Sequence, residues 1–401
     1  MSTVFPSDAY QASLKLLYAA STPSGFLASV QPISNYQRIF TRDGVITGLA
    51  ALLTGDETLV ATFAATLRTI FEAQHPTGFF PSNVVLDTGQ ASYGGNCGRI
   101  DNVSWAIIGL LQYTLLTQTD ELATRYAGRI EQAFRVLDAW EFNGRHLIYV
   151  PQSGDWADEY VQHGYMLYDQ LLRVWALELA GRYWQRPAWL DQARAIRAVL
   201  VCNYWNKEDA TDAQSLYAPN LRHQRLNTPR TFWLMGFNSS RVYAQFDLAA
   251  NVLALLLDLG TKTHADCLLH YLQQQIEARQ FLLPAYTPAI LPSDELAPEL
   301  RDNYAYEFRN QPHQFHNGGL WPVWNGWLCA ALWQQQRADM ADRLCAHLSM
   351  ANHLNFSGAR WGFYENLHGI THAPIGVPFC TWSAAGQLLA HSYRAGKRLV
   401  R

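Results

Sequence analysis

The chain has 401 residues, a formal net charge of −3 and 49% hydrophobic residues. This length and apolar content are enough to bury a large core, and because the basic residues are scattered rather than aligned in a stripe, we expect no nucleic-acid partner. The first residues lack a basic segment followed by an apolar one, and no run of about 18 apolar residues is free of polar breaks, so we expect no signal peptide, membrane span or membrane partner.

Apolar residues recur at three- and four-residue spacing in about a dozen segments, which predicts a succession of helices. The apolar stretch from Arg145 to Val150 is a candidate short strand. In chain order the predicted helices cover roughly 8–20, 43–54, 57–74, 102–117, 121–140, 165–181, 188–204, 245–260, 262–279, 318–336, 338–352 and 381–395.

The predicted helices alternate in kind along the chain. The second helix and every second one after it are more apolar and richer in small residues, whereas their partners carry charge on one face. A helix covered on most sides is apolar nearly all round, and a helix on the outside keeps a polar face. The alternation therefore predicts an all-α fold, the (α/α)6 barrel or toroid of helical hairpins, as a single domain spanning residues 1–401.

Loops rich in polar and aromatic residues precede the inner helices, and in such a toroid these loops converge on one rim. Two longer irregular stretches, 205–240 and 281–316, are expected to wall a pocket there, because long structureless loops in a compact domain are usually functional. Their prominent aromatic residues are Trp233, Phe237, Tyr286, Tyr304 and Tyr306.

One rim loop places three carboxylates around a tryptophan. Asp155, Trp156, Asp158 and Glu159 lie just before the helix predicted at 165–181. Glycoside cleavage needs an acid that protonates the leaving oxygen and an aromatic face against which a sugar ring packs. The structural alternative is a solvated helix cap with an incidental tryptophan.

Glu365 is the candidate for a second carboxyl group. It is the only acidic residue after Asp342, and it lies in a loop that also contains Trp361, Phe363 and Tyr364. Burial among aromatic side chains would raise its pKa. Glu365 is therefore either a functional acid or the ion-pair partner of an arginine.

Three further aspartates stand at the starts of predicted inner helices. Arg42 and Asp43 open the first of them, and Asp101 and Asp247 hold similar positions later in the chain. Each aspartate is either a helix N-cap or an acceptor for sugar hydroxyls, with Arg42 fixing the carboxylate beside it.

Neither the histidines nor the cysteines form a metal-binding pattern. His313 and His316 lack a third ligand at a suitable spacing, so we expect hydrogen-bonding or structural roles for them and no metal or other cofactor. Widely spaced cysteines in or beside apolar segments are typical of reduced core thiols, which favours a cytoplasmic protein. The cysteines are Cys97, Cys202, Cys267, Cys329, Cys345 and Cys380.

Several motifs occur in order along the chain, and together they resemble those of glycoside hydrolase family 100, the alkaline and neutral invertases. The resemblance extends to related inverting (α/α)6 glucosidases and covers residues 36–392. It implies an inverting, exo-acting glycosidase that uses neither metal nor cofactor. The motifs are Thr41-Arg42-Asp43, Gln245-Phe246-Asp247 with Asn251, His316-Asn317-Gly318-Gly319-Leu320-Trp321-Pro322, and Thr381-Trp382-Ser383-Ala384-Ala385-Gly386.

The resemblance also implies roles for individual residues. The family's catalytic acid precedes the third inner helix, where Asp158 is the best match and Asp155 the second choice. Its base is a Glu that follows an Arg-Trp pair near the C-terminus, a position that Glu365 fills here. The residues expected to bind substrate are Arg42, Asp43, Asp101, Asp155, Trp156, His316, Asn317, Trp321 and Trp382.

The expected substrate is a small α-glucoside, first of all sucrose. The invertases carry a basic pair after the catalytic Asp, whereas Glu159 and Tyr160 follow here, so glucosylglycerate and α-1,6-glucosides stay open. Two other classes of function also stay open at this point: a sugar epimerase or isomerase with rim histidines as bases, and a sugar-binding protein without a working acid pair. The sequence leaves the formation of a homo-oligomer undecided.

Overall fold

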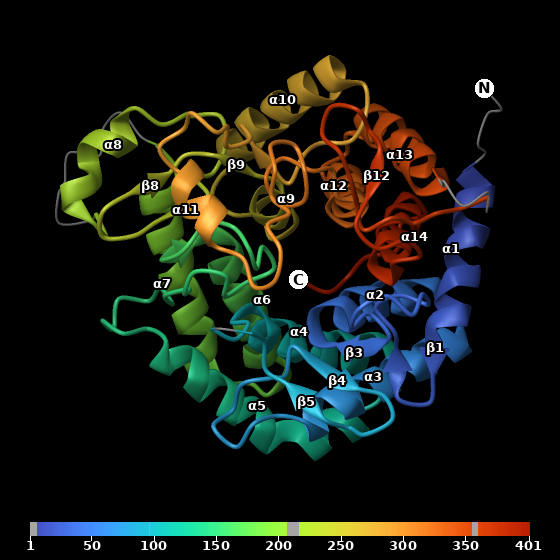
Figure 1. Ribbon diagram of the computed structural model, residues 1–401. Helices are drawn as coiled ribbons and strands as arrows, with labels where there is room; N and C mark the ends of the chain where they lie inside the picture. Colours follow the sequence, from blue (N-terminus) through green and yellow to red (C-terminus); the bar gives the residue numbers. More distant parts are fainter. Residues whose placement is uncertain (1–5, 96, 207–215, 355–359) are drawn as a thin grey trace.

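The inner wall of the molecule is a closed circle of helices (Figure 1). The computed structural model describes residues 6–95, 97–206, 216–354 and 360–401. Each inner helix packs on the next, and the last packs on the first. In order they are α2 (Thr41–Thr54), α4 (Asp101–Thr117), α6 (Leu167–Tyr183), α9 (Leu248–Leu256), α12 (Pro322–Gln334) and α14 (Thr381–Arg394).

An outer circle of helices surrounds the inner one. Residues of the inner helices are buried almost all round, whereas α5 buries one apolar stripe and exposes Glu121 and its neighbours to solvent. This is the alternation that the sequence predicts, and the (α/α)6 fold is confirmed. The outer helices are α1 (Pro6–Ala20), α3 (Glu57–Glu72), α5 (Glu121–Ala139), α7 (Pro187–Tyr204), α10 (Lys262–Arg279) and α13 (Ala338–His353).

Glycine brings two of the inner helices into close contact. A Cβ atom at Gly326 of α12 would lie 2.3 Å from the carbonyl oxygen of Gly386 in α14. Such a distance is far inside van der Waals contact, so a side chain at this position would push the two helices apart.

The end of the chain returns to the middle of the ring (Figure 1). The carbonyl oxygen of Val400 accepts a hydrogen bond from Trp175 Nε1 at 2.9 Å, and its N–H donates to Gln112 Oε1 at 3.0 Å. Because Gln112 belongs to α4 and Trp175 to α6, the C-terminal residues are anchored inside the inner circle, away from the N-terminal rim.

Short antiparallel strands lie on the rim where the inner helices begin. β3 leads into α2, β6 into α6 and β9 into α9, and these strands pair with β4, β7 and β10 respectively. Each pairing joins the loop before an inner helix to the segment that follows the next outer helix. The strands are β1 (Ser21–Thr22), β2 (Gly25–Phe26), β3 (Arg38–Phe40), β4 (Asn83–Val85), β5 (Ala91–Ser92), β6 (Tyr165–Met166), β7 (Gly236–Phe237), β8 (Val242–Tyr243), β9 (Phe246–Asp247), β10 (Tyr286–Thr287), β11 (Asn366–Leu367) and β12 (Pro374–Ile375).

The strand predicted from Arg145 to Val150 is wrong. Only Val150 pairs with another segment, through an isolated bridge to Gly164. The reason is that α6 satisfies this backbone with side chains: Gln170 donates to the carbonyl of Ile148 at 2.8 Å and accepts from its N–H at 3.0 Å. A stretch whose peptide groups are already bonded has no need of a neighbouring strand.

The long irregular stretches contain short helices as well as loops: η2 (Pro219–Leu221) and α8 (Arg222–Leu226) in the first, and α11 (Ala297–Asp302) in the second. The first stretch is a poorer pocket wall than predicted, because Trp233 and Phe237 are buried in the core. None of the six cysteines forms a disulfide. Within the described residues, no helix is long and apolar enough to cross a membrane.

Candidate active site

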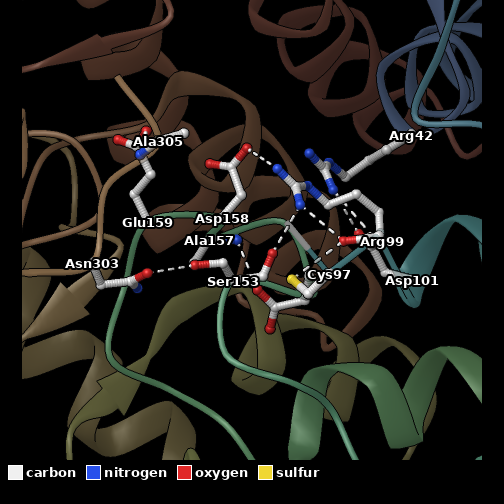
Figure 2. Close-up of polar contacts among 12 residues, drawn as sticks. Arg42, Cys97, Arg99, Asp101, Ser153, Ala157, Asp158, Glu159, Asn303 and Ala305 are labelled. Carbon is white, nitrogen blue, oxygen red and sulfur yellow. Dashed lines mark hydrogen bonds and ion pairs between the residues drawn. The ribbon is translucent and has the colours of Figure 1, made fainter. Parts of the chain in front are cut away.

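Three arginine–carboxylate pairs mark the rim where the loops converge. Arg42 pairs with Asp101 at 2.9 Å, and Arg99 pairs with Asp158 at 2.8 Å (Figure 2). A third pair joins Arg309 Nη2 and Glu159 Oε2 at 3.3 Å. The three arginines come from segments far apart in the sequence, so the fold gathers positive and negative charge into one region.

The carboxylates of the acidic loop have three different environments. Asp155 is buried, and its oxygens accept hydrogen bonds from the N–H of Ala157 and the amide of Gln162. Glu159 is also shielded, with 8% of its side chain exposed beside Arg309. Asp158 has 35% of its side chain exposed, so among the three it is the carboxylate that a ligand can reach.

The pKa values of these aspartates diverge accordingly. Burial raises the pKa of Asp155 to about 7, and the charge of Asp101 adds to the rise. Burial also acts to raise the pKa of Asp158, but the positive charge of Arg99 outweighs it, and the pKa of Asp158 lies below its ordinary value. In the free protein Asp158 is therefore ionised at neutral pH.

Glu365 lies just before β11. Its N–H donates to the carbonyl of Val377 at 2.9 Å, and the hydroxyl of Tyr36 donates to its Oε1 at 2.6 Å. Burial raises the pKa of Glu365 to about 7, against the lowering effect of the Tyr36 hydrogen bond. Gly376 passes so close that a Cβ atom there would lie 2.5 Å from Glu365 Oε2, and its φ of +75° also favours glycine.

Asp158 and Glu365 belong to one electrostatic environment. The carboxylate of Asp43 interacts with Asp158, and its charge also raises the pKa of Glu365. The guanidinium of Arg309 interacts with both carboxylates as well. Asp43 at the start of α2 and Arg309 of a later loop thus interact with both the proposed acid and the proposed base.

The first turns of α2 and α4 contribute a hydrogen-bonded group of charged residues to the site. Arg42 Nη1 contacts both oxygens of Asp101, and Tyr168 adds a hydroxyl at 3.3 Å from Asp101 Oδ2. Asp43 occupies the first turn of α2 without capping it, since the N-cap is Phe40. Burial raises the pKa of Asp43 to about 6. The carboxylates here accept hydrogen bonds, which is what sugar hydroxyls require of a binding site.

A buried aromatic cluster forms the wall beside Asp158. His316 stacks on Trp321 with ring centres 5.0 Å apart, and Trp156 meets both rings edge-on. Trp382 contacts Trp321 in the same way. Trp156 itself is 1% exposed, so it supports the wall rather than offering an open face to a sugar.

His316 is a neutral imidazole. Burial lowers its pKa to about 4, although Asp158 opposes that effect. Both of its ring nitrogens are buried and lack a hydrogen-bond partner within the described residues. A buried polar group without a partner is costly, so these nitrogens are suited to a ligand or ordered water.

The structure gives Asn317 and Asp247 roles in holding the backbone rather than in binding a ligand. The amide of Asn317 is used entirely within its own loop: Oδ1 accepts from the N–H of Ile290, and Nδ2 donates to the carbonyls of Ile290 and Asn310. Asn317 therefore holds the loop, and the prediction that it binds substrate is wrong for its side chain. Asp247 is the N-cap of α9, accepting from the N–H of Ala250 at 3.0 Å.

The sequence did not reveal the partners that tune the carboxylates. Arg99 and Tyr36 act on residues 59 and 329 positions away, and Arg309 acts on Glu159 from 150 positions away. The position of Arg99 two residues before Asp101 was a weak signal, and nothing pointed to Tyr36. Among the described residues, no group of three or more His, Cys, Asp or Glu is arranged to hold a metal ion.

Comparison with known families bears directly on this site. Residues 208–395 match the family model of the alkaline and neutral invertases, glycoside hydrolase family 100. The match covers just under half of the chain, including Glu365 and the inner helices α9, α12 and α14. This chain is a glycoside hydrolase. The resemblance predicted from the sequence is confirmed, and no curated protein matches the chain in a separate sequence search.

Solved structures share the fold of this glycoside hydrolase at low sequence identity. The family 63 mannosylglycerate hydrolase of Thermus thermophilus, solved with Tris, is 18% identical over 95% of this chain and 99% of its own, with a TM-score of 0.59. A bacterial glucoamylase solved with acarbose is 12% identical over 98% and 56%, with a TM-score of 0.64. A glycosidase variant solved with glucose is 12% identical over 98% of both chains, with a TM-score of 0.59.

Proposed function

We propose that this glycoside hydrolase cleaves a small neutral α-glucoside, with sucrose as the first candidate, and inverts the anomeric carbon. The observation that carries the proposal is the pairing of a reachable carboxylate, Asp158, with a second one, Glu365, through their common neighbours Asp43 and Arg309. Inverting hydrolysis needs two carboxyl groups flanking the glycosidic bond, one as acid and the other as base.

In this mechanism Asp158 donates its proton to the glycosidic oxygen as the bond to the anomeric carbon breaks. Glu365 accepts a proton from a water molecule, whose oxygen attacks the anomeric carbon from the opposite face. One water is consumed, and the leaving sugar and the inverted glucose are released. Arg42, Asp43 and Asp101 hold the hydroxyls of the glucosyl ring, and the neutral His316 contributes a further hydrogen-bonding edge.

In the protein without substrate, the proton that Asp158 must donate resides mostly on Glu365. The pKa of Glu365 is about 7, whereas that of Asp158 is lowered, so a singly protonated pair carries its proton mostly on Glu365. The productive form has the proton on Asp158 and is the minor one. It is rare but strongly acidic, and an acid held beside Arg99 transfers its proton readily once the leaving oxygen gains negative charge.

The charge balance favours a neutral leaving group. Each arginine that reaches the acidic cluster already has a carboxylate partner: Arg42 has Asp101, Arg99 has Asp158, and Arg309 has Glu159. A leaving group with its own carboxylate, such as the glycerate of mannosylglycerate, would compete for these cations and meet repulsion from Glu159. A neutral sugar such as fructose avoids both costs, which is why we place sucrose ahead of glucosylglycerate.

A substrate screen with two variants tests the assignment. Wild-type enzyme is assayed on sucrose, trehalose, maltose, isomaltose, glucosylglycerate and α-glucosyl fluoride. Asp158→Asn is expected to lose about 10²–10⁴-fold on the disaccharide and much less on the fluoride, which departs without protonation. Glu365→Gln is expected to lose activity on both substrates.

Glu295→Gln serves as the control, because 89% of the Glu295 side chain is exposed and its ion-pair partner is Arg241 rather than a residue of the proposed site. If Asp158→Asn hydrolyses the disaccharide at the wild-type rate, Asp158 is not the acid. A wild-type preference for glucosylglycerate over every neutral substrate would refute the charge argument.

A further inference from the structure

Residues 303–310, here called the strap, lie across the acidic loop. Asn303 accepts from Ser153 Oγ at 2.9 Å (Figure 2) and donates to the carbonyl of Tyr160 at 2.7 Å. Asn310 donates to the carbonyl of Glu159 at 2.9 Å. Both ends of the strap are thus fixed to the segment that carries Asp158.

The middle of the strap holds the side chain of Glu159. The N–H of Ala305 points to Glu159 Oε1 at 3.4 Å (Figure 2), and Arg309 pairs with Oε2 at 3.3 Å. Arg309 also lies over the ring of Phe315, 5.2 Å from its centre. Glu159 is therefore occupied as an anchor, and it sets the position of the strap relative to the neighbouring Asp158.

Between these anchors the strap displays two aromatic rings. Tyr306 is 94% exposed, the highest value for a large hydrophobic residue in the described part of the chain, and Tyr304 is 48% exposed. Tyr304 is braced by Phe308, with ring centres 6.5 Å apart. The packing of the fold gives no reason for a ring as exposed as that of Tyr306, and exposed aromatic residues beside a catalytic site are typical of ligand contacts.

The location of the strap defines which part of a substrate it can meet. Asp158 protonates the oxygen between glucose and the leaving group, while Arg42, Asp43 and Asp101 hold the glucose. Figure 2 shows Arg42 and Asp101 on one side of Asp158 and Glu159 on the other. Under the proposed function, the strap that holds Glu159 therefore lies on the side of the leaving group. In Figure 1 the segment that follows α11 reaches toward the centre of the ring, as a leaving-group contact requires.

We infer that the strap forms the leaving-group subsite, in which Tyr304 and Tyr306 offer stacking faces to a neutral sugar ring. The inference rests on the proposed function and adds a substrate class: disaccharides or longer glucosides whose leaving group has an apolar ring face. A leaving group without a ring gains nothing from these tyrosines. The strap therefore selects among glucosides without touching the glucose.

The test compares two substrates that differ only in the leaving group. Tyr306→Ala and Tyr304→Ala are assayed on the neutral disaccharide that the wild type cleaves fastest and on α-glucosyl fluoride. Loss of a stacking contact should lower kcat/KM for the disaccharide about three- to tenfold, mainly through KM, and leave the fluoride unchanged. The free leaving sugar should also inhibit the variants more weakly than the wild type.

Phe142→Ala is the matched control, because Phe142 is a ring with 73% exposure outside the strap. An unchanged ratio of the two kcat/KM values in both tyrosine variants overturns the inference. So does an equal loss on both substrates. A change of oligomeric state in Tyr306→Ala, measured by light scattering, would instead assign this ring to an interface between copies of the chain and overturn it as well.

The outcomes also separate this inference from the proposed function. If the wild type hydrolyses neither α-glucosyl fluoride nor any of the disaccharides, the proposed function is wrong. The inference of a leaving-group subsite is then wrong as well. If both kinds of substrate are hydrolysed and only the tyrosine effect is missing, the proposed function stands and the strap has no part in binding the leaving group.

Discussion

Replacing Tyr36 with Phe removes one hydrogen bond from the proposed base and leaves the other carboxylates in place. The Tyr36 hydroxyl donates to Glu365 Oε1 at 2.6 Å, and Glu365 is 7% exposed. A hydrogen bond to a charged group contributes roughly 1.5–3 kcal/mol, and one pKa unit corresponds to about 1.36 kcal/mol. The substitution should therefore raise the pKa of Glu365, already about 7, by roughly one to two units.

The pH dependence of kcat/KM reports this shift. With Asp158 as the acid and Glu365 as the base, the active form carries one proton, which in the free protein resides mostly on Glu365. Activity therefore falls as pH rises through about 7, where that proton is lost. In Tyr36→Phe the fall moves to higher pH, and the plateau below it drops about ten- to hundredfold, because the proton is found on Asp158 less often.

At pH values above the fall of the Tyr36→Phe profile, the wild-type and variant profiles should coincide. Glu365 is then ionised in both proteins, so the population of the active form depends only on the pKa of Asp158. Tyr126→Phe is the matched control: Tyr126 of the outer helix α5 donates to Glu72 of the outer helix α3 at 2.9 Å, and neither residue contacts the proposed acid or base. A fall that moves while the plateau keeps its wild-type height would make Glu365 the acid and refute the assignment of roles. A fall that does not move would refute the effect of the hydrogen bond.

Three further substitutions test the local geometry. Arg99→Met should raise the pKa of Asp158 by about one unit or more, moving the acid-side fall of kcat/KM toward neutral pH; an unmoved fall would show that the ion pair does not control Asp158. Gly376→Ala should lower both kcat and Tm, since the new methyl group would press on Glu365 Oε2 and a φ of +75° is strained for a residue with a side chain, whereas unchanged kinetics would mean that the loop yields freely. Gly326→Ala should destabilise the helix contact by about 1–3 kcal/mol, seen as a lower Tm, and an unchanged Tm would contradict the packing described for that contact.

The fold could be predicted because its signal is repeated along the chain. Every inner helix must be apolar all round and every outer one amphipathic, so each hairpin repeats the same evidence. The absence of a strand at 145–150 could not be predicted, since the groups that satisfy the backbone of this segment belong to α6. The side chain of Gln170, which replaces a strand partner, carries no mark of that role in the sequence.

The site was predictable only in part, for a related reason. Asp158 and Glu365 stand out locally, one in an acidic loop and the other as an isolated carboxylate among aromatic residues. Their protonation depends on Arg99 and Tyr36, which the fold brings in from distant segments. Asn317 was misjudged because its motif indicates the loop but not which groups the amide binds within it.

The anomeric form of the first product tests the central claim most directly. Proton NMR during the early turnover of an α-glucoside distinguishes the two anomers of released glucose before they interconvert. Hydrolysis by Asp158 as acid and Glu365 as base predicts β-glucose as the initial product. Initial release of α-glucose would show retention, and it would contradict the account in which Glu365 activates water against the face opposite Asp158.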